Sequence, residues 1–419
     1  MIDGFNRDTV QALVAGRVAE EEADTALVAS AVPERRPLQV DPEFFSSTAY
    51  LNYFPPSYEW LLGKSLRRGC LGVIAGPPGA GKGTLAIQFA VAVAGGLPFL
   101  DTWPVPSPGP VLYLSAEDDA LVIHRRAHHA LMQLPENIRS TAAASFYGVA
   151  VHGQVHLCTG GRGTAVTPTP HLADLRTLLE KVRPSLLILD TLARFAGIEE
   201  NDNPAMTGFC GHLEDIIADL DCNIILLHHS NKTAGDCVES PDELAKALTQ
   251  TAMRGASALS GCIRWGLLMA PLGASLAVKL IGDEARGRAD GSFVAVRVGK
   301  KNAGAPEPRY YLARGEQGLL YRVEAAGQEK AEGDIIADAH NLAEEVRRRE
   351  ADGEKRMSVS RCGQDAFSWG ISRTRKTVER GLALELFFKV KSGKREHLCS
   401  DCSDCSDDPG TKELLNEIQ

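Results

Sequence analysis

Residues 76–84 read Gly76-Pro77-Pro78-Gly79-Ala80-Gly81-Lys82-Gly83-Thr84, and they lie between an apolar run at 70–75 and a helical pattern at 85–93. A strand, a glycine-rich loop and a helix in this order predict a phosphate-binding P-loop, because the glycines let backbone N–H groups turn inward towards the positive helix N-terminus. Lys82 then reaches the β- and γ-phosphates of a nucleotide. An ordinary Gly/Pro turn is the alternative, and the three glycines before Lys82, the lysine itself and a hydroxyl in register weigh against it.

Two positions are candidates for binding Mg²⁺. The residue after the P-loop lysine is usually a Ser or Thr that binds the ion, but here it is Gly83, and the hydroxyl follows at Thr84. The candidates in the loop are therefore Thr84 or water alone. Asp190 ends the apolar run 186–189, which places its carboxylate at the carboxyl edge of a parallel sheet, where such sheets bind ligands. A turn or helix cap is the alternative for Asp190.

Two further apolar runs end in polar side chains. The run 111–115 is followed by Glu117, Asp118 and Asp119. Glu117 is a candidate general base for an attacking water, whereas Asp118 or Asp119 is expected to cap the next helix. The run 223–227 ends in His228 and His229, where a side chain could sense the γ-phosphate. Two solvated or internally satisfied histidines are the alternative.

The whole chain has 419 residues, 44% apolar content and a formal net charge of −9. This size predicts one large core and a smaller domain. The acidic balance argues against a protein that coats nucleic acid, although a local basic groove stays open. No apolar run reaches the ~18 residues of a membrane span, so we expect a cytoplasmic protein without membrane contact. The ten cysteines lack disulfide spacing, which suits a reducing compartment.

The expected fold class is α/β, a mostly parallel sheet with helices on both faces. Residues 55–325 form this core, because apolar runs at 70–75, 111–115, 186–190 and 223–228 alternate with helical patterns. Later β-rich segments are expected to extend the sheet antiparallel at one edge, namely 276–281, 293–300, 309–313 and 319–323. Around the core we predict an N-terminal arm or small helical cap (1–54), a helical linker (326–352), a small domain (353–396) and a disordered acidic tail (397–419).

Six motifs occur in order along residues 55–310 and resemble RepA-type hexameric replicative helicases of plasmids, members of the RecA-like P-loop ATPases. They are 108–118, 189–195, 226–232, 254–257, 263–265 and 300–306. The resemblance implies an ATP- and Mg²⁺-dependent enzyme in which Lys82 is the phosphate lysine, Glu117 the base, Asp190 the Mg²⁺ acid and His229 the γ-phosphate sensor. It also implies that Arg264 is a finger inserted into the neighbouring subunit's site. Because Arg264 lies in the apolar run 262–269, its charged side chain is expected to need a partner, and an ion pair within its own chain is the alternative. Gly83 departs from this family, in which Ser usually follows the lysine.

The resemblance further implies a homo-oligomer, expected to be a hexameric ring, with single-stranded DNA in its channel and a replication initiator or primase as a further partner. An arginine supplied in trans stabilises charge on the γ-phosphate, and head-to-tail contacts close into rings. Lys300 is expected to point at the neighbour's phosphate, with an exposed hairpin lysine as the alternative. The segment between His229 and Arg254 is where the superfamily places its DNA-contacting loop, although its charge is mixed.

Residues 353–396 carry eleven Lys and Arg against five Asp and Glu, and their pattern predicts a small winged helix-turn-helix. In its second helix, residues 373–386, Val378 faces inward, while Lys376 faces outward towards a phosphate groove. A protein-docking domain or a solvated basic face is the alternative. Cys399, Cys402 and Cys405 have partly metal-like spacing, but a disordered low-complexity tail is the simpler interpretation.

The sequence thus predicts an ATP-dependent helicase or translocase for plasmid, phage or mobile-element replication. A non-translocating ATP switch that loads or regulates replication or recombination proteins is the principal alternative. A phosphotransferase is a weaker alternative, because no lid or acceptor motif is evident.

Overall fold

The computed structural model describes residues 57–151, 153, 155–161, 163–230, 237–253, 257–302 and 307–351. Beyond residue 351 it describes 357–358, 362, 367, 376–379, 388–392 and 395–399. The predicted arm at 1–54, Arg254, and Cys402 and Cys405 of the tail lie outside these residues. The compact unit that contains the core begins at Tyr58.

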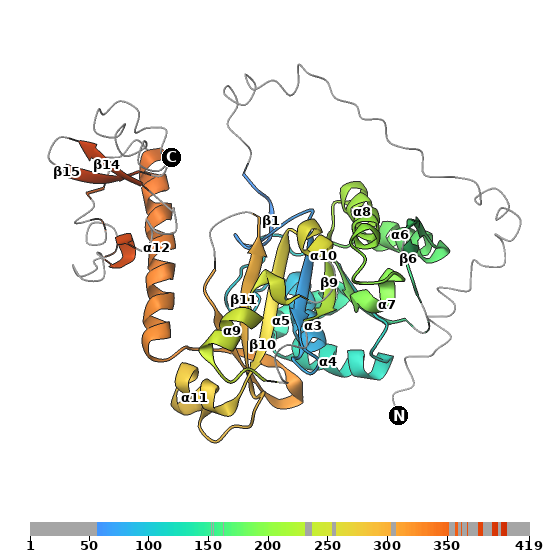
Figure 1. Cartoon of the computed structure of the whole chain (residues 1–419), viewed down its shortest axis with the longest axis horizontal. Coiled ribbons are helices and arrows are strands. Elements are labelled where there is room, and N and C mark those ends of the chain that lie inside the picture. The colour runs from blue at the N-terminus through green and yellow to red at the C-terminus, as the bar shows by residue number, and fades with distance from the viewer. Residues whose placement is uncertain are drawn as a thin grey trace, which may run out of the picture. The chain divides into compact units, whose positions relative to one another are not determined.

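A sheet of nine strands forms the centre of the described core, in the order β13-β12-β11-β10-β3-β9-β8-β4-β5. Figure 1 labels β9, β10 and β11 of this sheet. Six strands run parallel: β3 (Leu71–Gly76), β4 (Val111–Ser115), β5 (Phe146–Ala150), β8 (Leu186–Asp190), β9 (Asn223–His229) and β10 (Trp265–Leu272). Three continue the sheet antiparallel: β11 (Phe293–Lys301), β12 (Tyr310–Arg314) and β13 (Leu320–Val323). This is the predicted α/β, RecA-like architecture, with the strand that carries the P-loop in the middle.

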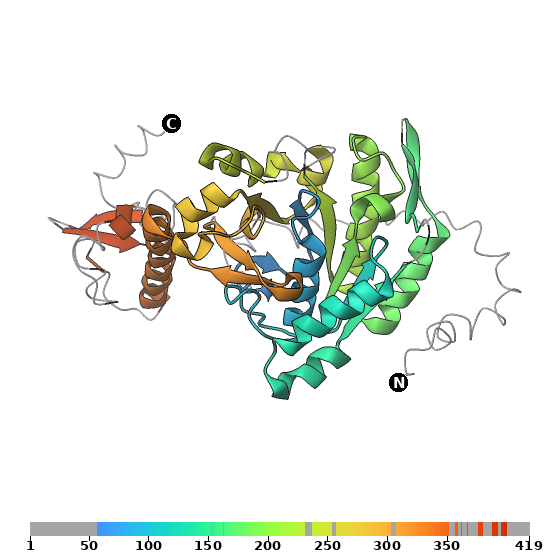
Figure 2. The same cartoon turned by 90° about the horizontal axis from the view of Figure 1, so that it is seen from below.

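Helices pack on both faces of this sheet, and the strand residues alternate between the two layers (Figure 2). In β3, Val73 and Ala75 belong to one apolar cluster and Ile74 to the other, as the two-residue repeat of a strand requires. The Ile74 side carries α3 (Lys82–Gly95), α4 (Ala120–Met132) and α5 (Glu136–Ala144). The opposite side carries α6 (Pro170–Val182), α7 (Leu192–Ala196), α8 (Asn203–Leu220), α9 (Pro241–Ala247), α10 (Ser257–Cys262) and α11 (Ala274–Ile281).

Residues 276–281 were expected to be β-rich, and that prediction is wrong, because they lie in α11. Leu276, Ala277, Leu280 and Ile281 are buried, at a spacing of one and four residues that matches one face of a helix. Glycines flank the helix at 273 and 282, and Gly282 has a φ of 91° that ends it. Helical periodicity therefore outweighs the apolar composition of this segment.

The remaining described elements are short or peripheral. They are β1 (Trp60–Leu62), β2 (Leu66–Arg67), the hairpin β6 (Cys158–Gly161) and β7 (Thr164–Pro168), and three 3₁₀ turns, η2 (Gln250–Ala252), η3 (Asp283–Ala285) and η4 (Glu316–Gly318). A long helix, α12 (Gly327–Ala351), occupies nearly all of the range 326–352 that was predicted to be helical, and its role as a linker stays a prediction. Of the helices in the described part of the chain, none is long and apolar enough to cross a membrane.

The C-terminal region is described only in part. A hairpin forms there from β14 (Phe388–Ser392) and β15 (Arg395–Cys399). Because β15 continues to Cys399, the segment predicted as a disordered tail from residue 397 begins inside a strand. In the short helix at 376–379, Val378 is buried and Lys376 exposed, which agrees with the predicted faces. The complete winged helix-turn-helix stays a prediction.

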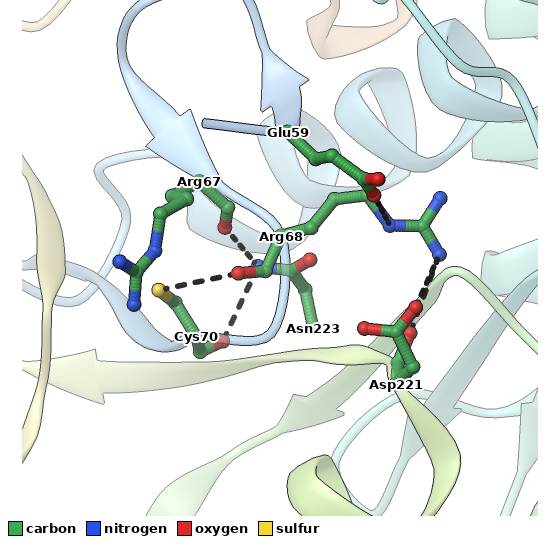
Figure 3. A network of polar contacts seen from close by, with 6 residues as sticks. All are labelled: Glu59, Arg67, Arg68, Cys70, Asp221 and Asn223. Atoms are coloured by element: carbon green, nitrogen blue, oxygen red, sulfur yellow. Dashed lines mark hydrogen bonds and ion pairs between the residues drawn. The ribbon is translucent and has the colours of Figure 1, made fainter. Parts of the chain in front are cut away.

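A polar network fixes the amino ends of the central strands (Figure 3). The amide of Asn223, at the start of β9, donates to the carbonyl oxygens of Arg67 at 2.8 Å and Cys70 at 3.3 Å. Arg68 pairs with the carboxylate of Asp221 at 3.3 Å and lies 3.8 Å from that of Glu59. These contacts join the β1–β2 hairpin to β9 at the edge of the sheet opposite the P-loop.

Candidate active site

The P-loop follows β3 and takes the conformation that its glycines permit. Gly79 and Gly81 have φ values of 75° and 92°, in the region that side chains rarely adopt. Helix α3 then begins at Lys82, with Gly81 at its N-cap. Backbone N–H groups of the first helical turn lack intrahelical partners, so they are available to an anion. The loop predicted from the sequence is therefore present between a strand and a helix.

Lys82 is buried and its ammonium faces back into the loop. Its Nζ donates to the carbonyl oxygens of Gly76 and Pro77, both at 3.0 Å, and lies 3.3 Å from Nδ1 of His229. Burial lowers the pKa of Lys82 to about 8, while the nearby carboxylates of Asp190 and Glu117 act in the opposite direction. An incoming polyphosphate would supply the negative charge that this ammonium lacks.

Asp190 ends β8 at the same edge of the sheet. It is 4% exposed, and the hydroxyl of Tyr113 on β4 donates to its Oδ2 at 2.5 Å. Burial raises the pKa of Asp190 to about 6; the Tyr113 hydrogen bond lowers this pKa, whereas Glu117 and Asp118 raise it further. A divalent cation would reverse this by stabilising the carboxylate.

Glu117 lies beside Asp190 because their strands are paired, with Ser115 of β4 opposite Asp190 of β8. The hydroxyl of Thr191 donates to Oε1 of Glu117 at 3.0 Å, which orients the carboxylate. The Ser115 hydroxyl accepts from the backbone N–H groups of Glu117 and Asp118 and so fixes the turn after β4. Asp119 caps α4 by accepting from the N–H of Val122 at 2.8 Å, as one of the two predicted caps.

The two histidines at the end of β9 point to opposite faces. His229, which is paired with Gly76 of β3, faces Lys82. Burial, followed by the Lys82 charge, lowers the pKa of His229, so its ring is neutral near pH 7 and can accept from the ammonium. His228 is 1% exposed, and its Nδ1 lies 4.0 Å from the carboxylate of Glu200. Of the predicted pair, His229 is thus the one positioned to reach a phosphate.

Position 83, not 84, faces the Asp190 carboxylate. A Cβ built on Gly83 would lie 2.9 Å from Nη1 of Arg126 and 3.2 Å from Oδ2 of Asp190. Thr84, about 100° further round the helix, instead has its Oγ1 4.0 Å from a Cβ built on Gly318. The geometry therefore does not favour Thr84 as a replacement Mg²⁺ ligand. Glycine leaves room here for the Arg126 guanidinium, which pairs with Asp118.

The residues present fit Mg²⁺ bound together with a nucleotide. Among the described residues no three His, Cys, Asp or Glu side chains form a ready-made metal cluster. Mg²⁺ usually keeps several waters and takes only one or two carboxylates plus substrate phosphates, so a complete cage is not needed. Asp190 can supply the carboxylate, and Asp118 lies close enough to influence its pKa.

Sequence reasoning missed four residues that contact this site: Tyr113, Arg126, Thr191 and Arg314. Tyr113 had a signal, because it is the single aromatic hydroxyl in the run 111–115, on a strand next to that of Asp190. Thr191 follows Asp190 directly in the sequence. The positions of Arg126 on α4 and Arg314 on β12 depend on tertiary packing, and no motif marks them.

Arg264 and Lys300 lie at the other edge of the sheet. Trp265 of β10 is opposite Gly72 of β3, and Gly266 is opposite Lys300, whereas the P-loop leaves β3 after Gly76. Both cations bond to the end of α10: Arg264 Nη1 donates to the carbonyl oxygens of Gly261 and Cys262, and Lys300 Nζ to that of Ser260 at 2.8 Å. Burial, followed by the Arg264 charge, lowers the pKa of Lys300.

The expectation that Arg264 is enclosed in an apolar run is wrong. The run at 262–269 is divided, because α10 ends at Cys262 and β10 begins at Trp265, and Arg264 is exposed between them. Within the described ranges, no carboxylate forms an ion pair with Arg264. The alternative of a satisfied intrachain ion pair therefore finds no support here.

Comparison with known proteins gives two findings. Residues 34–235 match a family model described as AAA domain. Among solved structures, the KaiC-like protein of the hyperthermophilic archaeon Pyrococcus horikoshii OT3 is similar, with 12% sequence identity and a TM-score of 0.38 over 64% of this chain and 100% of that one. The family match and the loop geometry identify the core as a P-loop ATPase domain.

Proposed function

We propose that this chain is an ATP-driven DNA helicase or translocase that works as a ring, with single-stranded DNA in its channel. The ATPase part rests on the convergence of Lys82, Glu117, Asp190 and His229 at the carboxyl edge of the sheet. Lys82 would hold the terminal phosphates, and Asp190 would hold Mg²⁺, which offsets phosphate charge when bound. Glu117, oriented by Thr191, would take a proton from the attacking water.

One observation supports the ring: Arg264 and Lys300 lie at the amino edge of the sheet, away from their own P-loop. Four residues of β3, at ~3.3 Å per residue, separate the level of Trp265 from that of Gly76. A phosphate contact by either cation would thus be made with another subunit. Such a contact is head-to-tail, and repeated rotation closes it into a ring. A guanidinium in trans stabilises the charge that develops during phosphoryl transfer.

The first experiment tests the ATPase. The Lys82→Ala variant should lose nearly all ATP hydrolysis, while Lys181→Ala, an exposed lysine of α6, should match the wild-type rate. Equal rates in Lys82→Ala and wild type would remove the P-loop from the mechanism.

The second experiment separates a motor from a switch. Native mass is measured with and without nucleotide and single-stranded DNA, and ATPase rates are compared with single-stranded and duplex DNA. A motor should form a larger assembly, respond to single strands and separate the strands of a forked duplex in the presence of ATP. An ATPase that assembles but never separates strands would instead be the non-translocating switch that regulates replication or recombination proteins.

A further inference from the structure

Arg314 reaches the P-loop from the antiparallel part of the sheet. Arg314 is the last residue of β12. Strand β12 is antiparallel to β11, and β11 is antiparallel to β10, so β12 runs in the same direction as β10. Because β10 is parallel to β3, β12 also runs in the same direction as β3. The end of β12 is therefore at the phosphate-binding edge. The Arg314 Nη2 donates to the carbonyl oxygen of Gly79 at 3.0 Å, and a Cβ built on Gly81 would lie 3.2 Å from its Nη1.

The charged guanidinium of Arg314 is bonded to backbone oxygens. Its bonds are to two backbone carbonyl oxygens, those of Gly79 at 3.0 Å and Gly291 at 3.4 Å. Across the residues that the structure describes, no carboxylate forms an ion pair with it. Arg126, the other guanidinium near the loop, does pair with the Asp118 carboxylate. Burial lowers the pKa of Arg314, but an arginine stays protonated at physiological pH, so the charge persists beside the phosphate loop.

The turn after Arg314 is fixed against the P-loop helix. The Gln88 side chain of α3 makes two hydrogen bonds with the backbone of Leu320: its Nε2 donates to the carbonyl oxygen at 2.9 Å, and its Oε1 accepts from the N–H at 3.0 Å. The same turn brings Gly318 near Thr84. The turn is thus held beside the first helical turn of α3, where the phosphates are expected. Arg314 is consequently a positioned group rather than a freely rotating surface cation.

We propose that Arg314 is a phosphate-binding residue of its own subunit's nucleotide site, complementary to Lys82 on the other side of the loop. This inference rests on the ATP-binding function proposed above. A guanidinium forms strong charge-assisted hydrogen bonds to phosphate oxygens, stronger than those to neutral carbonyls. The polyphosphate supplies the negative charge that Gly79 and Gly291 cannot supply. Since the guanidinium recognises phosphate, its contribution is the same whichever base the nucleotide carries.

The experiment measures the dissociation constants of Mg-ATP and Mg-GTP by calorimetry for wild type, Arg314→Met, Arg314→Lys and Arg322→Met. Arg322 is the matched control, because it is an exposed arginine on the neighbouring strand β13 that donates to the Thr102 hydroxyl and lies 4.9 Å from the ring centre of Tyr310. Loss of a charge-assisted hydrogen bond should weaken both nucleotides by ~10-fold or more in Arg314→Met. Arg314→Lys should recover part of that loss, and Arg322→Met should bind like wild type.

The possible outcomes are separable. Wild-type affinity in Arg314→Met overturns this inference and leaves the P-loop assignment intact. Weaker binding of only one of the two nucleotides assigns Arg314 to the base and also overturns it. If wild type itself binds neither nucleotide, the proposed function fails, and this inference fails with it. Thermal unfolding without nucleotide is the second readout: a large fall in both Arg314 variants, with no recovery by lysine, makes the residue structural and overturns the proposal.

Discussion

The ammonium of Lys82 and the Nδ1 atom of His229 lie 3.3 Å apart, across the paired strands β3 and β9. The ammonium is a donor and the ring nitrogen an acceptor, so this contact requires an unprotonated Nδ1. A phosphate that binds Lys82 competes with His229 for the same hydrogens. The occupancy of the site is thereby linked to the end of β9, from which the segment predicted to contact DNA departs.

The pH dependence of ATP binding follows from Lys82. The pKa of Lys82 in the folded protein, about 8, lies below the ordinary value of 10.5. Below about pH 8 the charged lysine therefore destabilises the folded state, and this destabilisation disappears as pH rises towards 10.5. Bound phosphate restores the charge. ATP affinity should therefore be constant below pH 8 and fall by up to ~10-fold per pH unit above it. Titrations between pH 7 and 9.5 check this, and a pH-independent affinity would contradict it; Lys82→Arg, always charged, should lack the fall.

Glu117→Gln should separate binding from hydrolysis. The amide keeps the shape of the side chain and can still accept from Thr191, but it cannot take a proton from water. Turnover should fall by at least ~10²-fold, while the dissociation constant for ATP stays within a few fold of wild type. Steady-state hydrolysis and nucleotide titration measure the two quantities. An equal loss of binding would make Glu117 a structural residue.

Thr191→Val tests how Glu117 is positioned. Valine has nearly the same shape as threonine but cannot donate to Oε1 of Glu117, so the carboxylate loses its orientation and the Thr191 site stays filled. We expect a roughly 10-fold lower kcat with little change in KM, because one hydrogen bond to a charged group is worth ~1.5 kcal/mol. Thr191→Ser, which keeps the hydroxyl, should recover most of the rate. A serine variant as slow as the valine variant would exclude this role.

Tyr113→Phe should shift the fall of activity on the acidic side of the pH profile to higher pH. The Tyr113 hydroxyl stabilises the Asp190 carboxylate, so without it the pKa of Asp190 rises above its present value of about 6. The pKa of Asp190 in the folded protein already exceeds the ordinary value of 3.8, so protonation of Asp190 stabilises the folded state as pH falls through 6. The same protonation removes the carboxylate that would bind Mg²⁺. The variant should lose activity at pH 6 to 6.5 and approach wild type at pH 8. Rate profiles of both proteins at limiting Mg²⁺, where the ion does not mask the pKa of Asp190, test this prediction, and superimposable profiles would refute the assignment.

Arg264→Ala tests whether the site is shared between subunits. The variant should bind ATP normally but turn over ~10³-fold more slowly, as when an arginine finger is removed. Mixing it with Lys82→Ala subunits should restore activity, because intact Arg264 from one chain can serve the intact P-loop of the other. Hydrolysis in the mixture, compared with each variant alone, is the measurement. If mixing restores nothing, Arg264 does not act across a subunit contact.

The central fold was predictable because its signals are local. Strands at 111–115 and 186–190 coincide with β4 and β8, since each is a short apolar run that ends in a polar residue. The segment 276–281 was mistaken for a strand because its Leu, Val and Ile residues are compatible with the repeat of a helix and with that of a strand over so short a length. The hairpin β6–β7 was not anticipated, although Gly160, Gly161 and Gly163 mark a turn.

The candidate site was predictable only where a side chain follows its strand. Asp190 and His229 end β8 and β9, Glu117 follows β4 closely, and Lys82 follows β3 after the short P-loop, so chain order and strand direction suffice to bring them together. Arg314 lies 232 positions after Lys82 and three strands away in the sheet, and only the pairing of β10, β11 and β12 brings it near. Contacts of this kind depend on sheet order, which no local pattern encodes.

The position of β10 shows that the ATPase core needs strands beyond the segment that carries its motif residues. The family match ends at residue 235, after all four motif residues, yet β3 has β10 as its neighbour on one side. In a fragment that stopped there, β3, which leads into the P-loop, would become an edge strand. Its backbone N–H and C=O groups would be unpaired on one side and could pair with a strand of another molecule. The fragment would also lack Gln88's partner on β13. A truncated or transplanted form of this ATPase therefore has to include the chain up to about residue 323, well beyond the end of the family match at residue 235.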